Sequence, residues 1–250
     1  MDDGGGERLR EMIGSAKRIV AFTGAGISTE SGIPDFRSPG GIWTKYQPIY
    51  FDDFMSSEEM RRESWRRKFA TDETLQKAEP NAGHRALAKL VETGRMTSII
   101  TQNVDGLHQR SGVPDSKVIE LHGNSTYATC LDCGHRHELE PIKKAFHASG
   151  ALPVCAKCDG IVKTATISFG QAMPLIAMAR AQDEAMACDL FIVLGSSLVV
   201  YPAAGFPRIA KRKGARLIIV NRDPTDQDAD ADMVIHAEIG PTMSRVVGVN

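Results

Sequence analysis

Apolar and polar positions alternate along the chain in blocks that predict strands and helices in turn. Short apolar runs bounded by turn residues are typical of buried strands, as at 19–22, 97–101 and 189–194. The run at 189–194 is apolar after its first residue, which is typical of a central parallel strand. Further strands are expected at 117–121, 164–169, 216–220 and 233–235, and helices at 7–17, 84–92, 175–188, 202–213 and the C-terminal residues. The alternation predicts an α/β fold built on a parallel sheet.

This pattern is interrupted twice, first at residues 39–80. Gly40, Gly41 and Pro48 precede a charged segment that has a suitable helix N-cap at Ser56 or Ser57. We interpret 39–80 as a helical insertion outside the main sheet. Its basic residues are interpreted as a solvated helix face rather than a binding patch; they are Arg61, Arg62, Arg66, Arg67 and Lys68.

The second interruption, at residues 126–160, contains two Cys-x-x-Cys pairs. Cys130 and Cys133 are separated from Cys155 and Cys158 by 21 residues. Two such pairs predict a closed tetrahedral site for one structural zinc ion. A redox Cys-x-x-Cys is the alternative, although two copies around a short segment make it the weaker one. The fifth cysteine, Cys188, is expected to be a small buried apolar residue.

The turn after the first strand carries half of a dinucleotide-binding fingerprint. Gly24 and Gly26 would let the backbone turn tightly and let a phosphate approach main-chain N–H groups. Thr29 stands where the strict pattern requires a third glycine, and the ribose-binding acid expected about 20 residues later is missing. Ser28 or Thr29 would cap a short helix that Gly32 and Pro34 end. A glycine turn without a ligand is the alternative interpretation.

Small and polar residues follow several of the predicted strands. Parallel strands bring their carboxyl ends to one edge of a sheet, where ligands bind, so these residues are expected together: Gly24–Gly26, Asp35–Arg37, Gln102–Asp105, His122, Gly195–Ser197 and Asn221. They imply a dinucleotide cofactor. His122 is the candidate general base, because an imidazole titrates near neutral pH, and a hydrogen-bonded structural histidine is the alternative.

Composition limits the remaining classes of function. The chain has 250 residues and a net charge of −1, so no global attraction to nucleic acid or membrane is implied. Its apolar runs are far shorter than the roughly 18–20 residues of a membrane span. The acidic, glycine-rich residues 1–7 are expected to be a frayed tail rather than a secretory signal, which indicates a cytoplasmic protein.

Several motifs together resemble the sirtuin family of NAD-dependent protein deacylases. They are Gly-Ala-Gly-Ile-Ser-x-x-Ser-Gly-Ile-Pro-Asp-Phe-Arg (24–37), Thr-Gln-Asn-Val-Asp-x-Leu-His (101–108), Leu-His-Gly (121–123), the cysteine pairs, Gly-Ser-Ser-Leu-x-Val-x-Pro (195–202) and Val-Asn-Arg (220–222). The similarity covers about residues 8–245. It implies a Rossmann-like domain of residues 7–38, 81–125 and 161–250, with 39–80 and 126–160 forming a smaller helical and zinc-binding domain.

The resemblance also implies a reaction, in which NAD is consumed and an acyl group, acetyl by default, leaves a protein lysine. The acyl oxygen would attack the nicotinamide ribose, nicotinamide would leave, and O-acyl-ADP-ribose and free lysine would form. His122 and Asn103 would be catalytic. NAD would contact Gly24, Ala25, Gly26, Ser28, Ile33, Asp35, Phe36, Arg37, Gln102, Asn103, Asp105, Gly195, Ser196, Ser197, Asn221, Arg222 and Ile239. The acylated peptide would add as a strand and contact Ile167, Phe169, Gly170 and Val199.

Two departures from the family pattern bear on the substrate. Gln171 replaces the usual acid after Phe-Gly, which leaves the preferred peptide sequence open. Trp65 and Lys68 stand where sirtuins specialised for acidic acyl groups carry tyrosine and arginine, so desuccinylation is not predicted. Removal of longer or lipoyl-type acyl groups, mono-ADP-ribosyl transfer and an NAD-sensing module remain alternatives. We expect acylated proteins or peptides as partners, no direct nucleic-acid or membrane binding, and a monomer.

Overall fold

The computed structural model of the protein describes residues 3–249. Its main helices are α1 (Asp3–Ser15), α2 (Phe51–Ser56), α3 (Glu58–Lys77), α4 (Ala82–Glu92), α5 (Leu107–Arg110), α6 (Leu139–Ser149), α7 (Leu175–Ala187), α8 (Phe206–Arg212) and α9 (Ile239–Val247). Its strands are β1 (Ile19–Thr23), β2 (Met96–Thr101), β3 (Val118–Glu120), β4 (Gly123–Cys130), β5 (Arg136–His137), β6 (Val162–Thr166), β7 (Leu190–Leu194), β8 (Arg216–Val220) and β9 (Met233–Ile235). A 3₁₀ helix, η1 (Ala25–Ser31), follows β1 directly.

A six-stranded sheet forms the larger part of the molecule. Its strand order is β3-β2-β1-β7-β8-β9 and every adjacent pair is parallel. This is the order of a Rossmann fold, in which the chain turns to opposite sides of the sheet on either side of β1 and β7. The predicted α/β class and the central position of the strand at 190–194 are confirmed.

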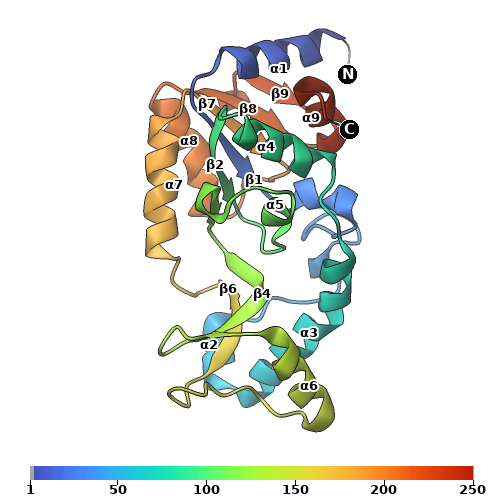
Figure 1. The fold of residues 1–250 in the computed structure, drawn as a ribbon, viewed down its shortest axis with the longest axis vertical. Coiled ribbons are helices and arrows are strands. Elements are labelled where there is room, and N and C mark those ends of the chain that lie inside the picture. Colours follow the sequence, from blue (N-terminus) through green and yellow to red (C-terminus); the bar gives the residue numbers. More distant parts are fainter. Residues whose placement is uncertain (1–2, 250) are drawn as a thin grey trace.

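Helices cover both faces of this sheet (Figure 1). Alternate residues of β1 point to opposite faces: Ile19 and Ala21 pack with residues of α1, α4 and α9, whereas Val20 and Phe22 pack with residues of α7 and α8. Both layers exclude water, because all five residues of β1 and of β7 are buried. The carboxyl edge of the sheet is therefore held on a rigid base.

A three-stranded antiparallel sheet, β5-β4-β6, forms the smaller part with α2, α3 and α6 (Figure 1). The strand predicted at 164–169 is found at 162–166, and it pairs with β4 instead of joining the large sheet. The sequence pattern places residues 162–166 with the large sheet because a helix and a parallel strand follow them. Strand pairing depends on β4, which the sequence analysis did not predict.

The N-terminal segment differs from its prediction. Residues 1 and 2 lie outside the described residues, but α1 begins at Asp3 instead of following a frayed tail. Three glycines oppose a helix there. Tertiary contacts outweigh them, because Leu9 is fully buried and the Arg10 guanidinium donates to the carbonyl of Arg245 at 2.9 Å. Among residues 3–249, no helix combines the length and the apolar character that crossing a membrane requires.

Candidate active site

The loops after β1 and β7 meet where the strand order reverses. The N–H of Gly24 donates to the carbonyl of Leu194 at 3.1 Å, and that of Gly26 donates to the carbonyl of Gly195 at 2.8 Å. A Cβ on Gly24 would lie 2.6 Å from the Gly195 oxygen, and one on Gly26 would lie 2.7 Å from the Gly195 Cα. Glycine is required at both positions for this close approach of two loops.

The N–H groups of Gly24 and Gly26 are themselves bonded within the protein, so a phosphate at this turn would use other main-chain N–H groups, and contact of the two glycines with NAD stays a prediction. The predicted helix cap is wrong: η1 begins at Ala25 with Gly24 as its N-cap, and it ends at Gly32 in the left-handed conformation, φ +83°. Ser28 is inside η1, and its hydroxyl is used elsewhere.

A buried polar cluster joins η1 to the loop after β2. The Ser28 hydroxyl donates to Asp105 Oδ2 at 2.8 Å. The Asn103 amide donates to the carbonyl of Gly24 at 3.0 Å and to Ser28 Oγ at 3.3 Å. Burial raises the pKa of Asp105, although hydrogen bonds from the Leu107 N–H and the Ser28 hydroxyl oppose this effect. Three residues predicted to contact NAD are thus fixed relative to one another.

His122 lies beside this cluster, after β3. Its Nδ1 is 3.1 Å from the carbonyl oxygen of Gln102, and the Gln102 side chain donates to Ser196 Oγ at 2.8 Å. A carbonyl can only accept, so Nδ1 carries the proton and Nε2 of the neutral ring is free to accept one. Burial lowers the pKa of His122 despite the opposing effect of the Gln102 carbonyl. The ring is therefore neutral near pH 7, as a general base must be.

The loop after η1 is folded around Asp35. Its carboxylate accepts from the N–H groups of Arg37 and Ser38 and from the Ser38 hydroxyl, and the Arg222 guanidinium after β8 donates to Ser38 Oγ at 3.1 Å. Burial acts to raise the pKa of Asp35, but these hydrogen bonds leave it lowered. A cavity of about 490 Å³ lies between this loop and Arg222, with Thr29 in its wall. It has the size of a small-molecule site.

Aromatic rings connect this loop to the predicted peptide site. Phe36 and Phe169 both pack against Trp43, with ring centroids 5.6 and 5.8 Å from it, and Tyr50 lies 6.0 Å beyond Phe169. Phe36 and Phe169 remain 39% and 41% exposed. The predicted cofactor loop and the predicted acyl-lysine site therefore share one partly open aromatic surface. The Arg37 guanidinium also lies over Trp43, 4.1 Å from the ring centroid.

The other predicted peptide residues lie beside these rings. The N–H of Ile167 donates to the carbonyl of His122 at 2.8 Å, so the strand leading to Phe169 is attached to the candidate base. Gly170 adopts φ +82° in the exposed turn that follows. Val199 is 45% exposed in the loop after β7. Gly170 and Val199 are therefore both on the surface, while their contact with a peptide stays a prediction.

The residues predicted for the adenosine half of NAD are less well gathered. The Asn221 amide donates to the carbonyl of Asp223, and Ser197 is exposed. Ile239 is 4% exposed and packs in the core with Ile27, so its side chain is not available to a ligand. The Ile239 side chain is therefore a structural residue, and Asn221, Ser197, Ile33 and Ala25 remain predictions.

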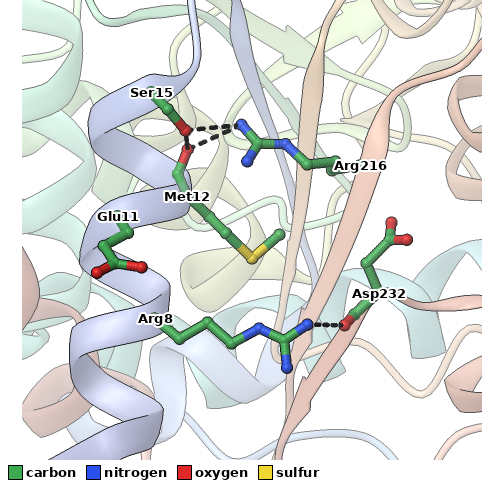
Figure 2. Close-up of a pocket in the computed structure, with 6 residues that line it drawn as sticks. All are labelled: Arg8, Glu11, Met12, Ser15, Arg216 and Asp232. Atoms are coloured by element: carbon green, nitrogen blue, oxygen red, sulfur yellow. Dashed lines mark hydrogen bonds between the residues drawn. The ribbon is translucent and has the colours of Figure 1, made fainter.

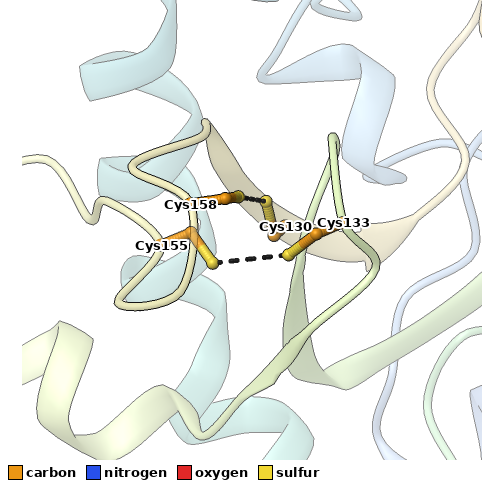
Figure 3. A group of neighbouring side chains, drawn as sticks. All are labelled: Cys130, Cys133, Cys155 and Cys158. Carbon is orange, nitrogen blue, oxygen red and sulfur yellow. Dashed lines mark hydrogen bonds between the residues drawn. The ribbon is translucent and has the colours of Figure 1, made fainter.

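The four paired cysteines converge in the small domain (Figure 3). Their sulfurs all lie within 4.8 Å of one another, with Cys130–Cys158 at 3.5 Å and Cys133–Cys155 at 3.6 Å. Zn–S bonds of about 2.3 Å place tetrahedral sulfurs about 3.8 Å apart, so the set fits one zinc ion. His122 precedes β4 and Cys130 ends it, so the eight residues of this strand separate the candidate base from the metal site, which agrees with a structural metal.

Helix α3 explains the two substitutions noted in the helical insertion. Trp65 is 2% exposed, stacks on Phe69 at 5.4 Å and packs in the cluster that contains Cys130 and Cys155. Lys68 is bonded to Asp72 at 2.6 Å, with both side chains almost buried. Neither residue is free to bind an acidic acyl group, and the expectation that desuccinylation is not the activity stays a prediction.

A second cavity, of about 530 Å³, lies far from these residues. It is formed by α1 and by the residues that begin β8 and precede β9, at the opposite edge of the sheet (Figure 2). Arg216 donates to the Met12 carbonyl and to Ser15 Oγ, and Arg8 donates to the Asp232 carbonyl. The Arg216 guanidinium caps the last turn of α1, and the Arg8 guanidinium fastens the helix to the residue before β9, so both groups already have protein partners.

Several buried polar residues below the site were not predicted from the sequence. Thr23 and Thr101 end adjacent strands and join through their hydroxyls at 2.8 Å, and His108 Nε2 lies 2.9 Å from Thr23 Oγ1. His84 packs on His108, with ring centroids 5.1 Å apart. The sequence did carry a signal for them: polar residues stand at matched positions of neighbouring strands, close to a polar loop.

A family model, relatives of known name and solved structures all connect the chain with one family of proteins. The model of the Sir2 family matches residues 24–202. An NAD-dependent protein deacetylase of Rhodopseudomonas palustris is 58% identical over 98% of this chain and 96% of the relative, and NAD-dependent protein deacetylase 1 of Bradyrhizobium diazoefficiens is 60% identical over the same shares. A solved Sir2 structure with a p53 peptide and NAD+ superimposes with a TM-score of 0.86 at 37% identity, covering 97% of each chain.

Proposed function

The chain belongs to the Sir2 family, and from this premise we propose that it is an NAD-dependent protein-lysine deacylase. Acetyl is its default acyl group, and its products are nicotinamide, free lysine and O-acyl-ADP-ribose. Because the acyl group ends on ADP-ribose, the reaction is a transfer. Relatives named as NAD-dependent deacetylases, and a Sir2 structure with a propionylated peptide at a TM-score of 0.85, support this proposal.

The observation that carries the proposal is the state of His122. Its Nδ1–H is used by the Gln102 carbonyl, and burial keeps the ring neutral, so Nε2 is the acceptor for a ribose hydroxyl proton. NAD supplies a ribose carbon that becomes electrophilic as nicotinamide leaves. Removing a hydroxyl proton lets that oxygen attack the acyl carbon, after which water completes the transfer.

The polar cluster around Asn103 would bind the nicotinamide end. Asn103 and Asp105 are held by Ser28 and the Gly24 carbonyl, so little side-chain freedom is lost on binding. Phe36, at the edge of the aromatic surface, would cover the space that nicotinamide leaves and exclude water from the ribose carbon. These roles require no movement of the sheet.

The acylated peptide would lie between the Gly170 turn and the loop that carries Val199. An extended peptide there gains main-chain hydrogen bonds irrespective of its sequence. The exposed rings of Phe169 and Tyr50 would then flank the aliphatic part of the acyl-lysine. We further propose that the protein acts in the cytoplasm, as a monomer, without binding nucleic acid directly.

Replacing the base tests the assignment. His122→Ala should lower formation of deacetylated peptide and O-acetyl-ADP-ribose from NAD and an acetylated peptide by about 100-fold or more, while NAD affinity changes little. His147→Ala, an exposed histidine on α6, is the matched control and should retain full activity. Turnover by His122→Ala at the rate of the wild type would contradict the proposal.

Two alternatives differ in the acceptor and in the acyl group. If the protein were a mono-ADP-ribosyltransferase, label from adenine-labelled NAD would remain on protein, whereas deacylation leaves it in a small molecule. For the acyl group, the α3 residues Trp65 and Phe69 pack in the small core, so neither is available to select a lipoyl chain. A panel of acetyl-, fatty acyl- and lipoyl-lysine peptides, followed by NAD consumption, ranks the substrates.

A further inference from the structure

Two histidines outside the proposed mechanism lie fully buried below the site. His84 and His108 are 0% and 2% exposed. His84 Nε2 and His108 Nδ1 have no hydrogen-bonding partner, and the two rings face each other with centroids 5.1 Å apart. Each buried polar atom without a partner costs free energy of folding.

The proton positions follow from the neighbouring contacts. The Asn81 N–H donates to His84 Nδ1 at 3.4 Å, so Nδ1 is an acceptor and the proton of a neutral His84 is on Nε2. The Thr23 hydroxyl donates its one proton to Thr101 Oγ1, so its oxygen accepts from His108 Nε2, and the proton of a neutral His108 is on Nε2. Burial lowers the pKa of His84 to about 4 and that of His108 to about 3, so both rings are neutral.

From His108 the hydrogen bonds run to the strand ends. His108 Nε2–H donates to Thr23 Oγ1 at 2.9 Å, and the Thr23 hydroxyl donates to Thr101 Oγ1 at 2.8 Å. Thr101 Oγ1 also accepts the main-chain N–H of Asn103 at 3.0 Å. His84 belongs to a separate set of bonds around Asn81, whose amide donates to the carbonyl of Ile27 in η1 at 2.7 Å and to Ser31 Oγ at 2.9 Å.

The geometry points to His108, Thr23 and Thr101 as positioning residues for the reaction, because they form a one-directional hydrogen-bond chain that fixes the main chain of Asn103 from below, while His84 packs against His108 without a hydrogen bond to it. The inference rests on the proposed function for its effect on rate, since Asn103 is placed there at the nicotinamide. None of the three touches the substrates; they set the main-chain position from which the Asn103 side chain reaches Gly24 and Ser28.

Variants matched in size separate positioning from mere stability. His108→Leu and Thr23→Val should lower kcat for nicotinamide release by about 10- to 100-fold, the cost of a displacement of about 1 Å in a reacting group, in protein that remains folded. His108→Gln and Thr23→Ser keep a donor or a hydroxyl at these places and should recover most of the rate. Ser98→Ala, on the same strand as Thr101 but bonded to Glu184, is the control expected to leave kcat unchanged.

A second measurement does not depend on activity. Long-range proton–nitrogen NMR of the imidazoles should show both His84 and His108 protonated on Nε2, and Thr23→Val should speed exchange of the Asn103 amide proton. His108 protonated on Nδ1, or folded His108→Leu with the kcat of the wild type, would overturn the inference. If the wild type releases no nicotinamide, the proposed function fails, and the NMR result alone then judges the hydrogen-bond chain.

Discussion

The large sheet and the small zinc-binding part of this protein obtain their order in different ways. Two extensive clusters of buried side chains hold the large sheet, one on each face. In the described part of the chain the small core consists of seven buried residues, and two of them, Cys130 and Cys155, belong to the metal site. A core of that size buries too little apolar surface to be stable alone.

This difference indicates which region can hold the reacting groups and which can adapt to a peptide substrate. The large sheet can hold unusual features such as crossing loops, buried carboxylates and unpartnered imidazoles, because packing around them is secure. The small part instead depends on an ion for its shape, and the exposed rings of Phe169 and Tyr50 lie where the two parts meet. Chemistry is accordingly expected at the large sheet, and adaptation to the acylated peptide at its junction with the small part.

The same substitution made in both regions gives the largest effect. Cys130→Ala should remove the metal and unfold the small domain, because binding a structural zinc supplies much of the folding free energy of such modules. Cys188→Ala also removes a buried thiol, but from the large core, and should cost about 1 kcal/mol. Zinc content and protease sensitivity distinguish the two. A folded, metal-free, fully active Cys130→Ala protein would refute the structural role of zinc.

A steric collision between the loops after β1 and β7 should have the next largest effect. Gly195 adopts φ +65°, and its Cβ would collide with the main-chain nitrogen of Ile27 and lie 2.8 Å from the Gly26 Cα. Gly195→Ala should cost the roughly 1–2 kcal/mol of the left-handed conformation plus that collision, and it should impair NAD binding. Gly214→Ala, at φ +95° with open space around it, isolates the conformational cost. Equal losses in urea denaturation would contradict the close approach.

The buried histidines predict how stability depends on pH. Their pKa values are lowered to about 4 and about 3 in the folded state, so between these values and about 6.5 the unfolded chain binds more protons. The free energy of unfolding should therefore fall as pH decreases below about 6.5, by up to about 1.4 kcal/mol per pH unit for each histidine. His108→Gln should reduce that slope. Calorimetry between pH 6.5 and 5.5, with zinc content monitored, provides the measurement.

The strands of the large sheet could be predicted from the sequence, whereas the pairing of the short strands and the contacts between loops could not. Apolar runs identified β1, β2 and β7, and strand ends located His122, Asn103 and Gln102 together, because both depend on local patterns and on the geometry common to parallel sheets. The pairing of β6 with β4 could not be predicted, since a short strand carries no mark of the sheet that it joins. The use of the Gly24 and Gly26 N–H groups also depends on a loop about 170 residues away.

The smallest expected effect lies at the junction between the two regions, at Gln171. Its Oε1 accepts the Ser168 N–H at 3.1 Å and closes the turn that presents Gly170. Gln171→Glu keeps this acceptor, so stability should change by less than about 0.5 kcal/mol, as for most surface substitutions. The added charge should favour peptides with lysine or arginine beside the acyl-lysine, lowering their KM a few-fold at low salt, because exposed charges act mainly through screened attraction.

Peptides with uncharged neighbours are the control. An equal change in KM for both peptides would show that the turn itself had moved, and no change for either would place the peptide's flanking residues away from Gln171.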